Sequence, residues 1–209
     1  SKYLKQNFSR VCTDLDVFYS FFGNDSVTIT GTNGKSTTAK LLYDVLRDQK
    51  KDARLVGNIG NPILSEKKII KKTFFVIEAS SYQLEYSKIF KSKYSAILNI
   101  TPDHIERHKN FKNYIEAKFR LLDSQTTKSV AFVKRNDPVI IKKLRSKKYK
   151  QKVIKIDTSL QPLIFKKIIN KYFMSSGNRE NLIFVLKICQ ILNLNKKKLL
   201  RTINKFKGL

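Results

Sequence analysis

Short apolar runs alternate along the chain with longer amphipathic stretches, and each kind of pattern predicts its own element. The run 73–80 has a continuous apolar centre, which is typical of a strand buried on both faces. Leu41, Leu42, Val45 and Leu46 recur at the spacing of a helix face. Strands are predicted at 26–30, 53–57, 73–80, 94–101, 129–133 and 152–156. Helices are predicted at 36–50, 111–124, 138–144, 181–192 and 196–206.

Strands and helices alternate in this order, which indicates an α/β domain with a P-loop-type, mostly parallel sheet flanked by helices. Residues 162–176 are predicted to add a small β-hairpin with its turn near 169–171. Ligands of such sheets bind beyond the carboxyl ends of the strands. The residues that directly follow each strand are therefore the candidates for function.

The segment GTNGKST, residues 31–37, follows the first predicted strand and begins the first helix. Glycines allow backbone amides to turn inward around a phosphate, and a helix N-terminus adds donors and a favourable dipole. Lys35 can reach the outer phosphates, and Ser36 can bind magnesium. The loop departs from the common P-loop, because only two residues separate Gly31 from Gly34. A plain glycine turn before a helix is the alternative, but the strand–turn–helix context favours phosphate binding.

Acidic and amide side chains follow the next two strands. Glu78 ends an apolar strand, where a carboxylate beside a phosphate loop suits magnesium. The alternative is a solvated glutamate, but only 16 residues of the chain are acidic, which gives this one more weight. Asn58 lies in the glycine-containing segment 57–62, which fits a ligand-binding loop and an ordinary turn equally well.

Both histidines, His104 and His108, follow the fourth predicted strand. A zinc-protease arrangement is excluded, because Glu106 does not directly follow the first histidine. A lone histidine is usually structural. The pair Asp103–His104 at a strand end facing a phosphate site is better interpreted as catalytic or close to a metal.

The net charge of +27 raises the question of a polyanionic partner. The lysines are spread along the chain and are not interleaved with aromatic residues in any repeated way. This spread favours solvated lysine-rich faces over a nucleic-acid or membrane surface. A basic surface still favours anionic substrates through long-range steering.

The remaining bulk features indicate a soluble protein. Cys12 and Cys189 lie far apart among apolar neighbours, which argues against a disulfide framework. No apolar run approaches the roughly 18 to 20 residues of a membrane span, and the N-terminus lacks the apolar core of a secretory signal. We expect a cytoplasmic monomer with no nucleic-acid or membrane partner.

Taken together, the segments after the strands resemble the Mur ligases, ATP-dependent amide ligases of peptidoglycan synthesis. GTNGKST is similar to the family's ATP loop, and GNIG and EASSYQLE are similar to motifs of its D-glutamate-adding branch. ILNITPDHIERH and YIEAKFRLLD are similar to the segments that carry a histidine and a carbamylated lysine. SGNRENLIFVLKICQIL resembles the helix start that meets adenine, and FKGL resembles the exit from the central domain. The resemblance implies ligation of D-glutamate to UDP-N-acetylmuramoyl-L-alanine through an acyl phosphate, driven by ATP.

The resemblance also implies a role for each matching residue. ATP would be bound by Thr32, Asn33, Gly34, Lys35, Ser36, Thr37 and Asn181, with Lys35 on the β- and γ-phosphates and Asn181 on adenine. One Mg²⁺ ion would be held by Ser36 and Glu78, and a second by His104 and a carbamate on Lys118. Asn58 and Ser80 would face the substrate. Catalytic roles would fall to Lys35, His104 and Lys118, with Asp103 and Arg107 in support.

The sequence departs from the family pattern in three places. The family has three domains, so residues 1–25 are expected to be a remnant of the linker and the N-terminal UDP-binding domain. Residues 26–209 are then the ATP-binding central domain, and the C-terminal domain is absent. Gly177 stands where the family has a histidine, and Glu106 stands where it has an aspartate.

Two alternatives remain open. The first is a related Mur or folylpolyglutamate-type ligase domain, against which the segments 57–60 and 78–85 argue. The second is a basic, non-enzymatic module that binds nucleic acid or another anion. Nucleotide binding separates the second alternative from the ligase, and a substrate panel separates the first.

Overall fold

Six parallel strands form the centre of the computed structural model, which describes residues 6–160 and 163–209. The strands are β1 (Ser26–Thr30), β2 (Ala53–Gly57), β3 (Phe74–Glu78), β4 (Tyr94–Ile97), β5 (Val130–Lys134) and β6 (Lys152–Ile156). Their order across the sheet is β2-β3-β1-β4-β5-β6. After β3 the chain crosses to the other side of β1, so the order changes direction there. Sheets of this kind bind ligands at such a point, beyond the carboxyl ends of the strands.

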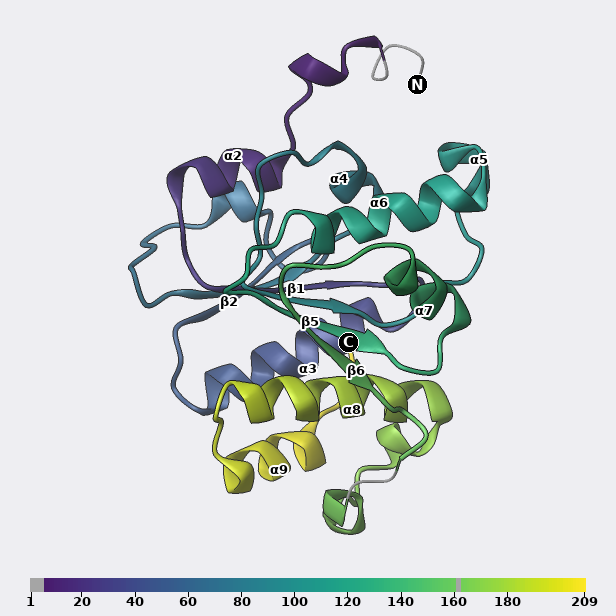
Figure 1. Ribbon diagram of the computed structural model, residues 1–209. Coiled ribbons are helices and arrows are strands. Elements are labelled where there is room, and N and C mark those ends of the chain that lie inside the picture. The colour runs from purple at the N-terminus through teal and green to yellow at the C-terminus, as the bar shows by residue number, and fades with distance from the viewer. Residues whose placement is uncertain (1–5, 161–162) are drawn as a thin grey trace.

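Helices cover both faces of the sheet (Figure 1). On one face lie α3 (Lys35–Asp48), α8 (Ser176–Ile191) and α9 (Lys196–Lys205). On the other lie α2 (Asp14–Phe21), α4 (Ser81–Tyr86), α5 (Ile105–His108) and α6 (Phe111–Asp123), and α7 (Pro138–Arg145) follows β5. Short 3-10 helices are η1 (Phe8–Arg10), η2 (Ile63–Ser65), η3 (Leu163–Lys167) and η4 (Lys171–Met174).

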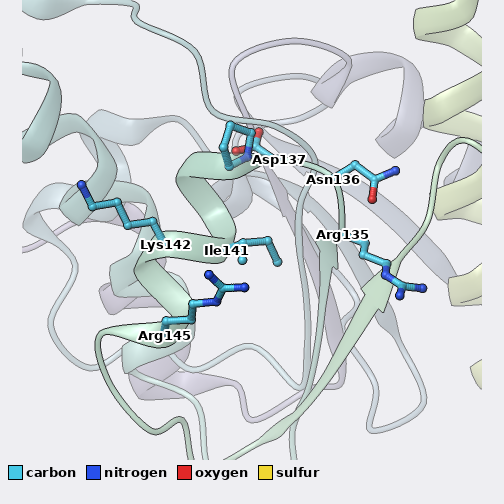
Figure 2. Close-up of a pocket in the computed structure, with 7 residues that line it drawn as sticks. Arg135, Asn136, Asp137, Ile141, Lys142 and Arg145 are labelled. Atoms are coloured by element: carbon cyan, nitrogen blue, oxygen red, sulfur yellow. The ribbon is translucent and has the colours of Figure 1, made fainter.

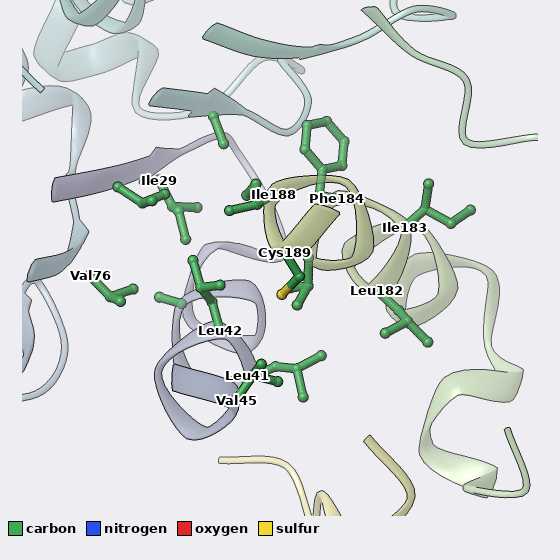
Figure 3. Close-up of a cluster of buried hydrophobic side chains, with 14 of the residues drawn as sticks. Ile29, Leu41, Leu42, Val45, Val76, Leu182, Ile183, Phe184, Ile188 and Cys189 are labelled. Atoms are coloured by element: carbon green, nitrogen blue, oxygen red, sulfur yellow. The ribbon is translucent and has the colours of Figure 1, made fainter. Parts of the chain in front are cut away.

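The core consists of two apolar layers, one on each face of the sheet. In the first layer, Ile29 of β1 packs with Leu42 of α3 and Ile188 of α8 (Figure 3). The second layer joins residues such as Phe75 and Phe119 beneath α2 and α6. Every residue of β1 is buried, and so are four of the five residues of β3, whose continuous apolar run predicted burial on both faces. These layers hold the ends of β1, β3 and β4 in place beneath the candidate site.

All six predicted strands and all five predicted helices are present, with shifts at their ends. The clearest shift is in α8, which begins at Ser176, five residues before the predicted start at 181. The structure adds α2, α4 and α5, for which no helix was predicted. No helix in the described part of the chain is long and apolar enough to cross a membrane.

The predicted β-hairpin is wrong. Gln161 and Pro162 lie outside the described residues, and the rest of the segment forms η3 and η4 instead of paired strands. Asn170, at the predicted turn, donates from Nδ2 to the carbonyls of Ile203 (2.8 Å) and Phe206 (2.7 Å), and its Oδ1 caps η4. Phe173 is buried in the core. The segment is therefore anchored to the end of α9 rather than to a partner strand.

Candidate nucleotide and metal site

The predicted phosphate loop connects β1 to α3. Gly34 is the N-cap of α3 and has a left-handed backbone, with φ of 82°. A Cβ built on Gly34 would lie 2.1 Å from Oδ1 of Asn181, so any larger residue would collide with α8. The turn thus depends on glycine both for its backbone angle and for its packing. Backbone N–H groups at the start of α3 are left for a ligand, as at any helix N-terminus.

Asn99, which follows β4, holds the loop in shape. Its Oδ1 accepts from the backbone N–H of Thr32 (3.1 Å) and of Asn33 (2.9 Å), and its Nδ2 donates to the carbonyl of Asn33 (3.1 Å). The sequence reasoning did not assign Asn99 a role. An amide directly after a buried strand, next to a glycine loop, was the available signal.

The side chains of Thr32, Lys35 and Thr37 all form hydrogen bonds in or next to the loop. The Thr32 hydroxyl donates to the carbonyl of Thr101 (3.1 Å) and lies 3.1 Å from the hydroxyl of Tyr114. Lys35 Nζ donates to the carbonyl of Thr32 (2.8 Å), so the lysine folds over its own loop. The Thr37 hydroxyl lies 3.3 Å from that of Tyr172. Ser36 lies half-buried in the first turn of α3.

Glu78 ends β3 with its side chain buried. Its Oε1 accepts from Nδ2 of Asn58 (2.9 Å), while Oε2 is buried without a hydrogen-bond partner among the described residues. An unpartnered buried carboxylate oxygen is costly unless something binds it. The residues present therefore fit a cation at Glu78. Asn58 orients this carboxylate, which is a different contact from the substrate contact implied by the resemblance.

Ser80 is the N-cap of α4, in a capping box with Gln83. Its hydroxyl donates to Oε1 of Gln83 (3.2 Å) and accepts from the N–H of Gln83 (3.2 Å). Nε2 of Gln83 in turn donates to the carboxylate of Asp14 in α2 (3.1 Å to Oδ2). A substrate contact at Ser80 would thus share its hydroxyl with the helix cap.

Lys118 is not a surface lysine but is buried in α6 with 1% of its surface exposed. Its Nζ donates to the carbonyl of Gly31 (2.8 Å) and lies 4.5 Å from the centre of the Tyr114 ring. Burial, and then the charge of Lys35, lower the pKa of Lys118 to about 7, against an opposing effect of Asp103. The amine therefore lies directly behind the phosphate loop and is partly neutral near pH 7.

His104 and His108 are placed very differently. His104 is exposed at the N-cap of α5, with φ of 51°, and its Nε2 lies 3.4 Å from Oδ2 of Asp103. His108 is buried, and its Nε2 lies 3.0 Å from the hydroxyl of Ser81. Burial lowers the pKa of His108. The ring of Tyr82 contacts both imidazoles, with its centre 5.1 Å from that of His104 and 5.5 Å from that of His108. Of the two, only His104 is free to meet a ligand.

Asn181 is buried in α8 against the phosphate loop at Gly34. Nearby, Nδ2 of Asn178 donates to the carbonyl of Tyr172 (3.0 Å). Gly177 has open space around its Cα, so the side chain that it lacks would have room there. The helix start implied to meet adenine is thus in contact with the loop implied to bind phosphates.

No group of three or more His, Cys, Asp or Glu side chains within residues 6–160 and 163–209 could hold a metal ion by itself. This does not conflict with magnesium, which is usually held by one or two carboxylates together with phosphates and water. Glu78 and Ser36 would supply such a partial set. A second ion at His104 would need an anion on Lys118, because an ammonium group repels a cation.

A hollow of about 510 Å³ lies apart from these residues, between the end of β5 and α7 (Figure 2). Its cations are Arg135, Lys142 and Arg145, all of them exposed. Asp137 lies at its edge, with Oδ1 and Oδ2 accepting from the N–H groups of Ile140 (3.0 Å) and Ile100 (2.9 Å). None of the predicted site residues lines this hollow, so it is not the candidate site.

Comparison with known proteins identifies the family of this chain. Residues 29–191 match the Mur ligase middle domain family. UDP-N-acetylmuramoylalanine–D-glutamate ligase of Rickettsia bellii is 33% identical over 220 residues, covering 95% of this chain and 48% of that protein. The ligase of the same name from Thermoanaerobacter sp. is 39% identical over 127 residues, covering 60% of this chain. The chain therefore spans about half the length of its Rickettsia relative.

Solved structures agree on the fold at lower identity. MurF of Acinetobacter baumannii is 15% identical, with a TM-score of 0.72 over 94% of this chain and 49% of that one. A MurF ligase of Thermotoga maritima, in complex with ADP, is 15% identical, with a TM-score of 0.70 over 93% of this chain. At this identity the likeness concerns the fold alone. Because the family model matches residues 29–191, most of this chain, the chain belongs to the Mur ligase middle domain family.

Proposed function

We propose that this chain binds ATP with magnesium and is the ATP-binding part of a ligase that adds D-glutamate to UDP-N-acetylmuramoyl-L-alanine. The substrates come from the names of the curated relatives. The observation that carries the proposal is the meeting of the phosphate loop with Lys118, whose amine donates to the carbonyl of Gly31. A phosphate loop alone would fit many nucleotide-binding proteins, whereas a buried lysine behind it does not follow from phosphate binding.

The phosphate loop supplies positive groups for the triphosphate. Backbone N–H groups at the start of α3 would face the β-phosphate, and Lys35 would leave the carbonyl of Thr32 to reach the outer phosphates. Gly34 lets the backbone approach the phosphates closely. Asn99 holds the two residues before it, because its Oδ1 accepts from the N–H groups of Thr32 and Asn33. In phosphoryl transfer, most of the catalysis consists of positioning and charge neutralisation.

Glu78 and Ser36 would hold one Mg²⁺ ion against the phosphates. The buried Oε2 of Glu78 has no partner among the described residues, and Asn58 fixes the other oxygen. Bound magnesium would neutralise charge on the phosphates. His104 would serve a second ion, together with a modified Lys118.

Lys118 would be modified by carbamylation. Its neutral amine adds to the carbon of CO₂ and loses a proton to solvent, which leaves a carbamate anion. With a pKa of about 7, roughly half of the amine is neutral at pH 7. The carbamate oxygens are hard donors that suit magnesium, and the modification replaces a buried cation beside Lys35 with an anion.

The ligation would proceed in two displacements. The terminal carboxylate of UDP-N-acetylmuramoyl-L-alanine attacks the γ-phosphorus of ATP, ADP leaves, and an acyl phosphate forms. The amine of D-glutamate then attacks the acyl carbon, loses a proton, and phosphate leaves. Lys35 would stabilise the charge on the transferring phosphoryl group. Substrate groups outside this chain's own site would be held by the rest of a full-length ligase.

Titration with ATP and magnesium tests the nucleotide half of this proposal. The 209-residue chain is compared with Lys35→Ala and with Lys40→Ala, a control on the same helix whose lysine pairs with Asp44 at 2.6 Å. Lys35→Ala is expected to bind ATP at least about tenfold more weakly, because it removes a charged contact to the phosphates. Lys40→Ala is expected to bind ATP as the original chain does. Equal binding by all three proteins would contradict the assignment. DNA binding that falls steeply with salt, without nucleotide binding, would favour the basic-module alternative.

Joining the chain to the outer domains of a curated relative tests the ligase half. We expect phosphate release that requires both D-glutamate and the UDP-sugar substrate, and that Lys118→Ala abolishes. Release that follows another amino acid instead would favour a related Mur or folylpolyglutamate-type ligase.

A further inference from the structure

Tyr114 lies one helical turn before Lys118 on α6, so the two side chains share a face of that helix. It is 1% exposed and is among the largest fully buried side chains of the described residues. No motif assigned it a role, and the proposed mechanism does not use it. Its contacts nevertheless reach three segments that carry candidate site residues.

The hydroxyl of Tyr114 reaches the phosphate loop. It lies 3.1 Å from the hydroxyl of Thr32, which also donates to the carbonyl of Thr101 (3.1 Å) and accepts from its N–H (3.0 Å). A continuous set of hydrogen bonds thus joins α6, the phosphate loop and the segment after β4. Burial raises the pKa of Tyr114, so the phenol keeps its proton at neutral pH.

The ring of Tyr114 forms a wall beside Lys118. Nζ of Lys118 lies 4.5 Å from the ring centre and is directed at the carbonyl of Gly31, 2.8 Å away. The same ring lies 5.3 Å from the ring of His108 and 6.5 Å from that of His104. A lysine has a long, flexible stem that loses much rotamer freedom when it is fixed. A rigid aromatic wall is one way to fix it.

We propose that Tyr114 is a positioning residue that holds the amine of Lys118 and the phosphate loop in a fixed relation. The ring limits where Nζ can lie, and the hydroxyl fixes Thr32. The two parts of the side chain act on different partners, so they are separable by substitution. The role of Tyr114 in ligation rests on the proposed function, but its effect on Lys118 does not.

The test compares Tyr114→Phe and Tyr114→Leu with Phe119→Leu. Phe119 is a matched control, because it is a fully buried ring on the same helix that contacts the ring of Tyr149 rather than Thr32 or Lys118 Nζ. Three measurements are made on each protein: melting temperature, the Kd for ATP with magnesium, and the rate at which cyanate modifies Lys118, followed by peptide mass spectrometry. Cyanate reacts with a neutral amine and needs no nucleotide.

We expect the two substitutions at Tyr114 to separate the measurements. Tyr114→Phe should raise the Kd for ATP about two- to tenfold, the effect of one lost hydrogen bond, and leave the cyanate rate unchanged. Tyr114→Leu should also raise the cyanate rate at Lys118 several-fold, because the wall is gone. Phe119→Leu should lower the melting temperature alone. In a double-mutant cycle, Thr32→Val with Tyr114→Phe should bind ATP no worse than Thr32→Val alone.

Each remaining result has a definite meaning. If Tyr114→Leu changes the cyanate rate no more than Phe119→Leu does, Tyr114 is an ordinary core residue and the inference is overturned. If the unsubstituted chain binds no ATP but Tyr114→Leu still exposes Lys118 to cyanate, the nucleotide proposal fails and the positioning of Lys118 stands. If Tyr114→Phe leaves a measurable Kd unchanged, the hydroxyl has no role in holding the loop.

Discussion

Burial and a neighbouring charge act together on Lys118, and they make the stability of the fold depend on pH. The folded protein holds the pKa of Lys118 at about 7, whereas the ordinary value is 10.5. Between these values the unfolded chain binds more protons than the folded chain, so stability rises with pH. We expect the free energy of unfolding to gain up to about 1.4 kcal/mol per pH unit from pH 7 to pH 9.

Lys118→Met tests this slope by urea unfolding at several pH values in CO₂-free buffer, which prevents carbamylation. The variant keeps the apolar stem and should lose the slope between pH 7 and pH 9. Above pH 9 the buried thiol of Cys189, whose pKa burial raises to about 12, contributes a slope of the opposite sign. A variant whose profile parallels that of the original chain would mean that Lys118 keeps its charge when buried.

Glu78 offers a second prediction at this scale, since its buried Oε2 has no partner among the described residues. Glu78→Gln removes a buried carboxylate but keeps its shape. In metal-free buffer we expect the stability to stay within about 1 kcal/mol of the original or to increase. Magnesium-dependent nucleotide affinity should fall at least about tenfold. Loss of stability and retention of magnesium dependence would mean that Glu78 is a structural residue.

At the scale of residues, the sequence could indicate which side chains are suited to bind phosphate or metal. It could not indicate which other residues hold those side chains in place. Glycine, lysine and serine at fixed spacing predict a phosphate loop, because the chemistry is local. Asn99 and Tyr114 contact Thr32 across 67 and 82 positions of sequence, so no local pattern contains them. The burial of Lys118 was equally hidden, since a lysine is rarely placed in a core.

At the scale of elements, the carboxylate of Asp16 docks α2 on the turn that follows α4. It accepts from the N–H groups of Phe90 (2.9 Å), Ile89 (2.9 Å) and Lys88 (3.0 Å) and from the hydroxyl of Ser87 (2.9 Å). Burial raises the pKa of Asp16, but these hydrogen bonds outweigh it and lower the pKa below its ordinary value. This one carboxylate thus satisfies several donors at once.

Asp16→Asn should therefore destabilise the protein by about 3 kcal/mol at pH 7, because an amide leaves part of these donors without an acceptor. Asp25→Asn is the control, since Asp25 is exposed and its carboxylate pairs with Lys93 at the surface. This substitution should cost less than about 1 kcal/mol. Stability from Asp16 is present above pH 3.8 and is lost as the pH falls. The difference between Asp16→Asn and the original chain should shrink near pH 3 in urea unfolding.

Strands and long helices could be predicted because their patterns extend over enough residues to reveal a period. The helices α4 and α5 have six and four residues, too few for a helical repeat to be recognised. The helix α2 has the cap Thr13 and buries Leu15 and Phe18, yet its acids are turned to other segments rather than to water. The mistaken hairpin had short apolar runs on both sides of Asn170, but Asn170 bonds to the end of α9.

At the scale of the whole molecule, the site lies beyond the carboxyl end of the central strand β1, between elements that belong to both core layers. The phosphate loop leads into α3, which packs in the first layer, while Lys118 lies on α6, which packs in the second. The central strand β1 connects them, since its end supplies Gly31 to Lys118. A substitution that disturbs either layer is therefore expected to disturb the same contact, that of Gly31 with Lys118.

The charge of +27 acts on the molecule as a whole and should speed the capture of nucleotide. Raising salt from about 50 mM to about 500 mM shortens the screening length, so the association rate of ATP should fall several-fold while dissociation changes little. Adenosine, which carries no phosphate, is the matched control ligand and should show no such fall. A triple charge reversal at Lys142, Arg145 and Lys148, exposed side chains outside the phosphate loop, should lower the rate at low salt and flatten its salt dependence. If ATP and adenosine respond alike to salt in stopped-flow measurements, the charge has no steering role and serves only to solvate the surface.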